Sequence, residues 1–179
     1  MTTSYKLNDG ASIPWLAIGS GTAHFGKDAT AAVAQALRAG ITHLDAAQIY
    51  RNEASVGEAI AQSGVPRASL FLTTKLGPLP AGKTVRDTLV ESLAKLQVEY
   101  VDLFLIHAPF QHPGRVVEVW KDMEECKKEG LAKSIGVSNA MVKDLEKILE
   151  SGSIVPAVNQ VCIPLLSSHL YPHTKSFYS

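Results

Sequence analysis

The sequence predicts an α/β fold of the (β/α)8 TIM-barrel type, cut short at about six parallel β/α strands and preceded by an amino-terminal β-hairpin. Short apolar runs alternate with longer amphipathic stretches, a pattern typical of strands covered by helices. The apolar runs recur at the spacing of βα units, and no G-x-G-x-x-G fingerprint follows the first of them. These observations favour a barrel over a doubly wound dinucleotide-binding sheet.

The chain begins with the predicted hairpin. Two short extended runs, 5–7 and 13–15, flank Asp9-Gly10, a dipeptide that is common in hairpin turns. The apolar run 15–18 then predicts the first strand of the barrel. Residues 28–39 predict the first helix, because alanine, valine and leucine recur there at three- and four-residue steps.

Two further βα units follow directly. The second unit has a predicted strand at 41–47 and a helix that spans about 53–63. The third unit has a predicted strand at 70–74, which Lys75 closes. Its helix is expected at 85–96, after Thr84 as the capping residue.

The next segments complete the predicted order of elements. Residues 101–106 are apolar at nearly every position, as expected for a strand that is buried on both faces. A charged amphipathic helix at 115–129, a strand at 132–137 and a helix at 140–149 follow. A short strand at 157–161 is the sixth in the predicted sheet.

The composition favours small-molecule chemistry over binding to a polyanion. The 17 Lys and Arg residues balance the 17 Asp and Glu residues, so neither nucleic acid nor a membrane surface is an expected partner. The two cysteines, Cys126 and Cys162, predict neither a disulfide framework nor a metal site. Because the chain lacks both a basic-apolar leader and an apolar run of about 20 residues, we expect a cytoplasmic protein.

Polar residues follow the apolar strands at the points where the strands end. Asp45 ends the second strand, Lys75 the third, His107 the fourth, and Ser138-Asn139 the fifth. In a barrel these ends share one rim, where such enzymes place their active sites. Each residue also has a structural interpretation, such as an ion pair between Asp45 and Lys75 or a loop aromatic for Tyr50. Their joint arrival at one rim favours an active site.

The residue types at this rim suit proton transfer to a carbonyl oxygen. A free phenol has a pKa of about 10, and a neighbouring cation lowers it. Lys75 would act in this way on Tyr50, Asp45 would hold Lys75 charged and oriented, and His107 would hydrogen-bond the carbonyl. A serine triad is disfavoured, because no G-x-S-x-G elbow surrounds Ser138. A lyase or aldolase that uses Lys75 as a Schiff base would leave Tyr50 and Asp45 without a role.

Several motifs resemble those of the aldo-keto reductase family. The segments that carry the resemblance are Leu44-Asp45-Ala46-Ala47, Tyr50, Asn52-Glu53, Val56-Gly57, Thr73-Thr74-Lys75-Leu76, Asp102-Leu103, Leu105-Ile106-His107-Ala108-Pro109, Ile135-Gly136-Val137-Ser138-Asn139 and Asn159-Gln160. The resemblance implies an NADPH-dependent oxidoreductase that reduces aldehydes and ketones to alcohols without a metal.

The same resemblance implies a role for each site residue. The implied catalytic residues are Asp45, Tyr50, Lys75 and His107, with Tyr50 as the proton donor. The implied cofactor-binding residues are Gly21, Thr22, Asp45, Ser138, Asn139 and Gln160, of which the last three would hold the nicotinamide carboxamide.

The resemblance covers residues 1–161 and fades in 162–179, which we expect to be a divergent tail, disordered or outside the barrel. A closed barrel needs about 250 residues, so the resemblance implies that the carboxy-terminal third of the family's barrel is missing and that activity is reduced or absent. The first and sixth strands would then be open edges, through which the chain could associate with itself. The alternative function is therefore a non-catalytic interaction or regulatory fragment that pairs through these edges.

Overall fold

The computed structural model describes residues 3–161, in which strands and helices alternate after a short hairpin. The strands are β1 (Ser4–Lys6), β2 (Ser12–Pro14), β3 (Ala17–Gly19), β4 (His43–Asp45), β5 (Phe71–Leu76), β6 (Val101–Ile106), β7 (Ala132–Ser138) and β8 (Asn159–Gln160). The helices are α1 (Thr30–Arg38), α2 (Glu53–Ser63), α3 (Val85–Leu96), α4 (Val116–Lys128) and α5 (Val142–Ser151). Short 3₁₀ turns are η1 (Thr22–His24), η2 (Gln48–Tyr50), η3 (Arg67–Ser69) and η4 (Pro109–Gln111).

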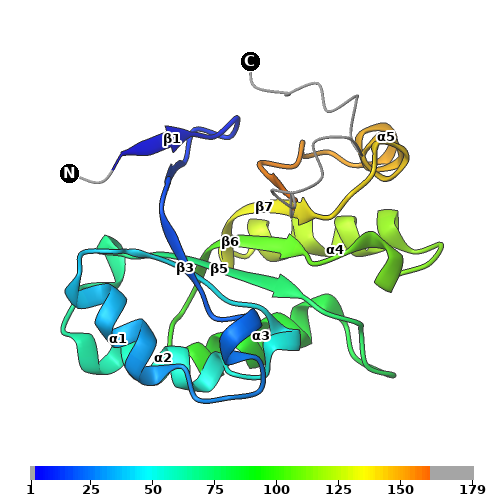
Figure 1. Ribbon diagram of the computed structural model, residues 1–179. Coiled ribbons are helices and arrows are strands. Elements are labelled where there is room, and N and C mark those ends of the chain that lie inside the picture. The colour runs from blue at the N-terminus through cyan, green and yellow to red at the C-terminus, as the bar shows by residue number, and fades with distance from the viewer. Residues whose placement is uncertain (1–2, 162–179) are drawn as a thin grey trace, which may run out of the picture.

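Six of these strands form one parallel sheet in the order β3-β4-β5-β6-β7-β8. Figure 1 shows α1, α2 and α3 on one side of this curled sheet and the β1–β2 hairpin on the opposite side. A doubly wound sheet would contain a point where the strand order reverses. The consecutive order contains no such point within the described residues, so the predicted barrel-type topology is confirmed.

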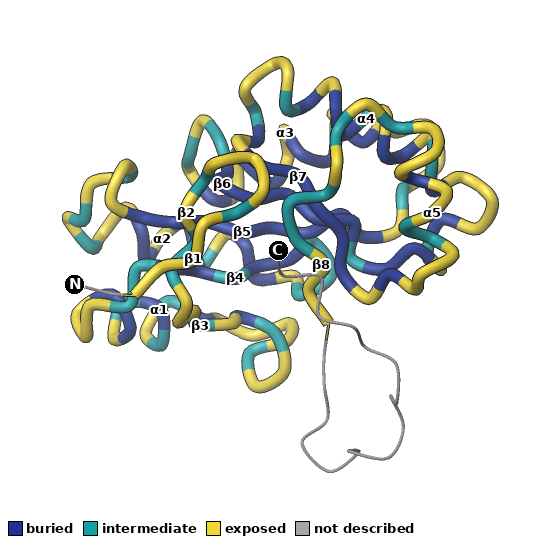
Figure 2. Tube along the Cα trace, turned by 90° about the horizontal axis from the view of Figure 1, so that it is seen from above, coloured by how far each residue is buried: buried dark blue, intermediate teal, exposed yellow. Residues whose placement is uncertain are grey.

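Alternate residues of each strand face opposite sides of the sheet. On β6, Phe104 and Ile106 belong to the large core between the sheet and the helices. Leu103 and Leu105 face the concave inner side, where they form a smaller apolar cluster with Phe71. The strands in the middle of the sheet, β5, β6 and β7, are buried along almost their whole length (Figure 2).

The predicted hairpin is present and packs against the far end of the sheet. Tyr5 pairs with Ile13 across the antiparallel β1 and β2. The Asp9 carboxylate in the turn accepts hydrogen bonds from Ser134 Oγ at 2.7 Å and Lys127 Nζ at 3.2 Å. These contacts hold the hairpin over the amino-terminal half of β7.

The predicted elements differ from the observed ones mainly at their ends. Lys75 does not close its strand but lies inside β5, where it pairs with Leu105 of β6. The second strand is shorter than the predicted range 41–47. The tail predicted at 162–179 lies outside the described residues. Among residues 3–161, no helix combines the length and the apolarity that crossing a membrane requires.

Candidate active site

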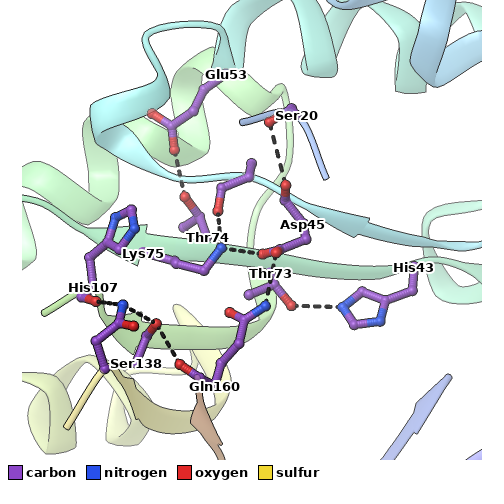
Figure 3. Close-up of polar contacts among 12 residues, drawn as sticks. Ser20, His43, Asp45, Glu53, Thr73, Thr74, Lys75, His107, Ser138 and Gln160 are labelled. Atoms are coloured by element: carbon purple, nitrogen blue, oxygen red, sulfur yellow. Dashed lines mark hydrogen bonds and ion pairs between the residues drawn. The ribbon is translucent and has the colours of Figure 1, made fainter. Parts of the chain in front are cut away.

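Several of the predicted site residues come from the carboxyl ends of different strands, and Figure 3 shows Asp45, Lys75, His107, Ser138 and Gln160 gathered there. Asp45 is the last residue of β4 and Ser138 is the last residue of β7, while His107 directly follows β6. Strand alternation turns Asp45 and Ser138 toward the inner face, whereas the neighbouring Leu44 and Val137 belong to the outer core. The barrel-type sheet therefore brings together side chains that are far apart in the sequence.

Asp45 and Lys75 form a buried ion pair at the centre of this carboxyl-terminal end of the sheet. Lys75 Nζ lies 2.5 Å from Asp45 Oδ1 and also donates to the Ala46 carbonyl oxygen at 3.2 Å. Gln160 Nε2 donates to the second carboxylate oxygen, Asp45 Oδ2, at 3.0 Å. The Lys75 side chain is only 2% exposed, so its charge is balanced by one carboxylate rather than by water.

Tyr50 lies against both the cation and the imidazole. Lys75 Nζ is 5.2 Å from the centroid of the Tyr50 ring. The rings of Tyr50 and His107 meet edge to face, with centroids 5.5 Å apart and an interplanar angle of 87°. The structure thus brings the four predicted catalytic residues together in one cluster.

A loop that contains Gly21 passes directly over the Tyr50 ring. A Cβ atom added to Gly21 would lie 2.9 Å from Tyr50 Cζ, so any larger residue here would require the Tyr50 ring to shift. Asn52 Nδ2 holds this loop by donating to the carbonyl oxygens of Ser20 at 2.7 Å and His24 at 2.8 Å. Thr22 begins η1 in the same loop. Of the two residues predicted to border the cofactor, Gly21 therefore lies against the Tyr50 ring, and Thr22 follows it in the same loop.

His107 is held in its neutral form. Burial, with a further contribution from the Lys75 charge, lowers the pKa of the His107 imidazole to about 4. Its Nδ1 atom is buried and has no hydrogen-bond partner among residues 3–161. At neutral pH one ring nitrogen of His107 can therefore donate a hydrogen bond while the other can accept one.

Ser138, Asn139 and Gln160 form a hydrogen-bonded group next to the ion pair. Ser138 Oγ donates to the Gln160 carbonyl oxygen at 2.8 Å, and Asn139 Nδ2 contacts Ser138 Oγ at 3.0 Å. Through the Gln160 side chain, this group is continuous with Asp45. Hydroxyl and amide groups offer both donors and acceptors, which match the carboxamide of a nicotinamide ring. The residues present therefore fit that group.

The geometry disfavours two other kinds of chemistry. The Lys75 ammonium is paired with Asp45 and a carbonyl oxygen, so it has no free lone pair with which to form a Schiff base. The Ser138 hydroxyl donates to a backbone oxygen rather than to a basic side chain. In the part of the chain that the structure describes, no three His, Cys, Asp or Glu residues gather as a metal site would require.

A second polar cluster, which the sequence analysis missed, lies behind Lys75 on the outer side of the sheet. Thr74 Oγ1 donates to Glu53 Oε1 at 2.7 Å, and Ser92 Oγ donates to Glu53 Oε2 at 3.2 Å. Gln48 Nε2 donates in turn to Ser92 Oγ at 3.2 Å. The sequence feature that indicates this cluster is Glu53, a charged residue whose helical spacing places it on the apolar face of α2.

The concave side of the sheet also contains a cavity of about 330 Å³ next to the site. Polar side chains, including His43, Thr73 and Gln160, line one part of it, and apolar side chains such as Leu103 and Leu105 line the rest. His43 is fixed there between the Pro14 carbonyl oxygen at 3.1 Å and Thr73 Oγ1 at 3.0 Å. Side chains therefore do not fill the inner face completely at this point.

Known proteins similar to this chain are reductases. The chain is 41% identical over 166 residues to an aldo-keto reductase of Mycobacterium sp. (strain MCS), covering 92% of this chain and 58% of that protein. It is 40% identical over 159 residues to methylglyoxal reductase DkgA of Escherichia coli (strain K12), covering 89% of this chain and 57% of that protein. The chain thus spans less than two thirds of the length of these relatives.

A solved structure shows the same fold. The aldo-keto reductase of Bombyx mori in complex with NADP superimposes with a TM-score of 0.80 and 36% sequence identity, covering 90% of this chain and 58% of that one. A sequence model of the aldo/keto reductase family matches residues 17–176. This match extends over most of the chain and includes the whole polar cluster at the carboxyl ends of the strands. The chain belongs to the aldo/keto reductase family.

Proposed function

We propose that this chain takes part in the NADPH-dependent reduction of aldehydes and ketones to alcohols, with Tyr50 as the proton donor. The observation that carries the proposal is the contact of one phenol with both a buried ammonium, Lys75, and a neutral imidazole, His107. When bound, NADPH supplies a hydride to the carbonyl carbon. The Tyr50 hydroxyl then gives its proton to the carbonyl oxygen, so that the carbonyl becomes an alcohol.

The other catalytic residues stabilise this proton transfer. The Lys75 ammonium, 5.2 Å from the centre of the Tyr50 ring, would stabilise negative charge that develops on the phenol, and Asp45 keeps that ammonium in place. His107, neutral because its pKa is about 4, offers an N–H group that orients the carbonyl oxygen. All four residues thus have one role each in a single reaction.

The cofactor would lie across the Ser138-Asn139-Gln160 group. These three residues would hold the carboxamide, and Gly21, Thr22 and Asp45 would border the nicotinamide. The proposal is supported by the hydrogen bonds that join the group to Asp45, and by the NADP complex of the Bombyx mori relative. The E. coli relative is named a methylglyoxal reductase, which makes a small aldehyde the first substrate to assay.

Fluorescence titration with NADPH and an assay of methylglyoxal reduction test the proposal. We expect saturable NADPH binding, and turnover that falls about a thousandfold in Tyr50→Phe with binding unchanged. The matched control is Tyr5→Phe, which removes the same hydroxyl from an exposed tyrosine in β1. Absence of NADPH binding, or full activity of Tyr50→Phe, would contradict the proposal.

The strand edges favour a second candidate function, association with another chain. Within residues 3–161 the sheet ends at β3 and β8, and Ala17, Gly19, Asn159 and Gln160 are exposed there. Such edges carry backbone groups that can pair with a further strand. Sedimentation velocity over a range of concentrations tests this candidate. Association together with absent turnover would favour it over the reductase.

A further inference from the structure

The loop that carries Tyr50, residues 46–52, and the first residue of α2, Glu53, are hydrogen-bonded to residues on both sides of Lys75. Before Tyr50 in sequence, Gln48 Oε1 accepts a hydrogen bond from the Gly77 amide at 2.9 Å. After Tyr50, Glu53 Oε1 accepts one from Thr74 Oγ1 at 2.7 Å. Thr74 and Gly77 lie on either side of Lys75 in the sequence, and Gln48 and Glu53 lie on either side of Tyr50.

Helix α3 joins these two attachments from behind. Gln48 Nε2 donates to Ser92 Oγ and to the Thr88 carbonyl oxygen, each at 3.2 Å. Ser92 Oγ donates to Glu53 Oε2 at 3.2 Å. A continuous set of hydrogen bonds therefore runs from Gly77 through Gln48, Ser92 and Glu53 to Thr74. It connects the Tyr50 loop, α3 and the strand that carries Lys75.

Glu53 lies where burial disfavours the charged form of a carboxyl group. Its hydrogen bonds are therefore expected to have a structural purpose. Glu53 is 2% exposed, and burial raises the pKa of its carboxyl although Thr74 and Ser92 donate to it. Its neighbours on the same face of α2 are Val56, Gly57 and Ile60, so an apolar side chain would suit the packing better. A carboxylate can accept from two different elements at once, which an apolar side chain cannot do.

We propose that Gln48 and Glu53 are positioning residues that fix the distance between the Tyr50 phenol and the Lys75 ammonium. This inference rests on the proposed role of Tyr50 as the proton donor. Neither side chain lies on the inner face with the reacting groups, so both act through the Tyr50 loop. A displacement of a reacting group by about 1 Å can lower the rate about 100-fold. The hydrogen bonds to Thr74 and Gly77 prevent such a displacement.

Substitutions to methionine, which keeps a similar length, test the proposal. For Gln48→Met and Glu53→Met we expect kcat to fall about 10- to 100-fold while KM and NADPH affinity change less than about threefold. The conservative Glu53→Gln keeps an acceptor for Thr74 and should retain most of the turnover. Gln62→Met and Glu58→Met make the same changes at exposed positions of α2 and should have no effect.

The kinetic isotope effect with 4-deuterated NADPH separates positioning from a loss of folded protein. If Tyr50 is displaced, the chemical step becomes slower and the isotope effect on kcat rises in Gln48→Met and Glu53→Met. If the network only stabilises the fold, activity falls in proportion to the folded fraction and the isotope effect stays constant. The second result would overturn the proposal.

A readout that needs no activity keeps the test independent of the proposed function. In a chain labelled with ¹³C-tyrosine, the ring signal of Tyr50 is assigned by its loss in Tyr50→Phe. We expect this signal to shift and broaden in Gln48→Met and Glu53→Met, while the signal of Tyr100, at the opposite end of the sheet, stays unchanged. An unchanged Tyr50 signal in both variants would refute the positioning role, whether or not the chain reduces carbonyls.

Discussion

Lys75 is a buried cation whose charge is balanced by the single carboxylate of Asp45. Asp45→Asn keeps the shape of the side chain but leaves the ammonium without its counter-charge. Breaking a buried pair in this way costs about 3 kcal/mol or more. We therefore expect urea denaturation to show that the free energy of unfolding falls by about this amount.

An exposed ion pair provides the control for Asp45→Asn. Lys83 and Glu91 also pair directly, but their side chains are 41% and 47% exposed. Exposed pairs contribute about 0 to 1 kcal/mol, so Glu91→Gln should have a small effect. Equal losses of stability in the two variants would show that the Asp45–Lys75 pair is hydrated rather than buried.

The imidazole of His107 predicts a pH dependence of stability. Its pKa in the folded chain is about 4, against an ordinary value of 6.5. Between these values the unfolded chain binds a proton that the folded chain does not, so stability falls as the pH falls from 6.5 to 4. Burial lowers the pKa of His43 as well, which adds to the same trend.

Two measurements check this pH dependence. In NMR titrations the ring signals of His107 should change near pH 4, and a midpoint near 6.5 would contradict the prediction. His107→Gln should reduce the slope of unfolding free energy against pH in this window, without removing the part that His43 contributes.

Among the elements, α3 shows best how a local signal defines a boundary. Thr84 Oγ1 accepts from the Asp87 amide, and the Asp87 carboxylate accepts from the Thr84 amide. Thr84→Ala removes the first of these bonds and should lower the free energy of unfolding by about 1 kcal/mol in urea denaturation. Thr84→Ser retains the accepting oxygen, so its free energy of unfolding should stay close to that of the unchanged chain. Equal losses in both variants would argue against the cap.

Signals that depend only on neighbouring residues, such as this cap, also explain which elements could be predicted from the sequence. Residues 85–96 and 101–106 were predicted with the observed bounds, because a cap and a continuous apolar run are properties of neighbouring residues. The sequence predicts a strand at 70–74, shorter than β5 at its carboxyl end, because a charged residue such as Lys75 is typical of a strand end. Its side chain is charged, but its backbone continues the ladder with Leu105. Side-chain polarity alone does not indicate where backbone pairing stops.

The site residues that lie at the ends of strands could be predicted from the sequence. The contacts between separate elements could not. Asp45, Lys75 and His107 share a rim because parallel strands end together, which the order of elements already implies. The contacts of Gln48 with Ser92 and Gly77 join a turn, a helix and a strand. Such contacts depend on how α2 and α3 pack on the sheet, and no spacing in the sequence specifies that packing.

For the whole molecule, the two faces of the sheet should contribute unequally to stability. Leu72 and Leu105 are both 0% exposed, but Leu72 lies in the helix-covered core and Leu105 borders the cavity of about 330 Å³. Leu72→Ala should therefore cost about 3 to 4 kcal/mol and Leu105→Ala about 2 kcal/mol or less. Urea denaturation of this matched pair checks the difference. A larger loss for Leu105→Ala would show that the inner face is the principal core.

The consecutive order of β3 to β8 also bears on how the chain folds as it is synthesised. Each strand pairs with the one made immediately before it, so no strand must wait for a distant partner. The phenol, the ammonium and the imidazole can come together as soon as β6 has emerged from the ribosome. The Gln160–Asp45 hydrogen bond, which spans 115 positions of the sequence, can form only much later. On a translating ribosome, the proton-transfer half of the pocket would thus take shape before the half that faces the nicotinamide.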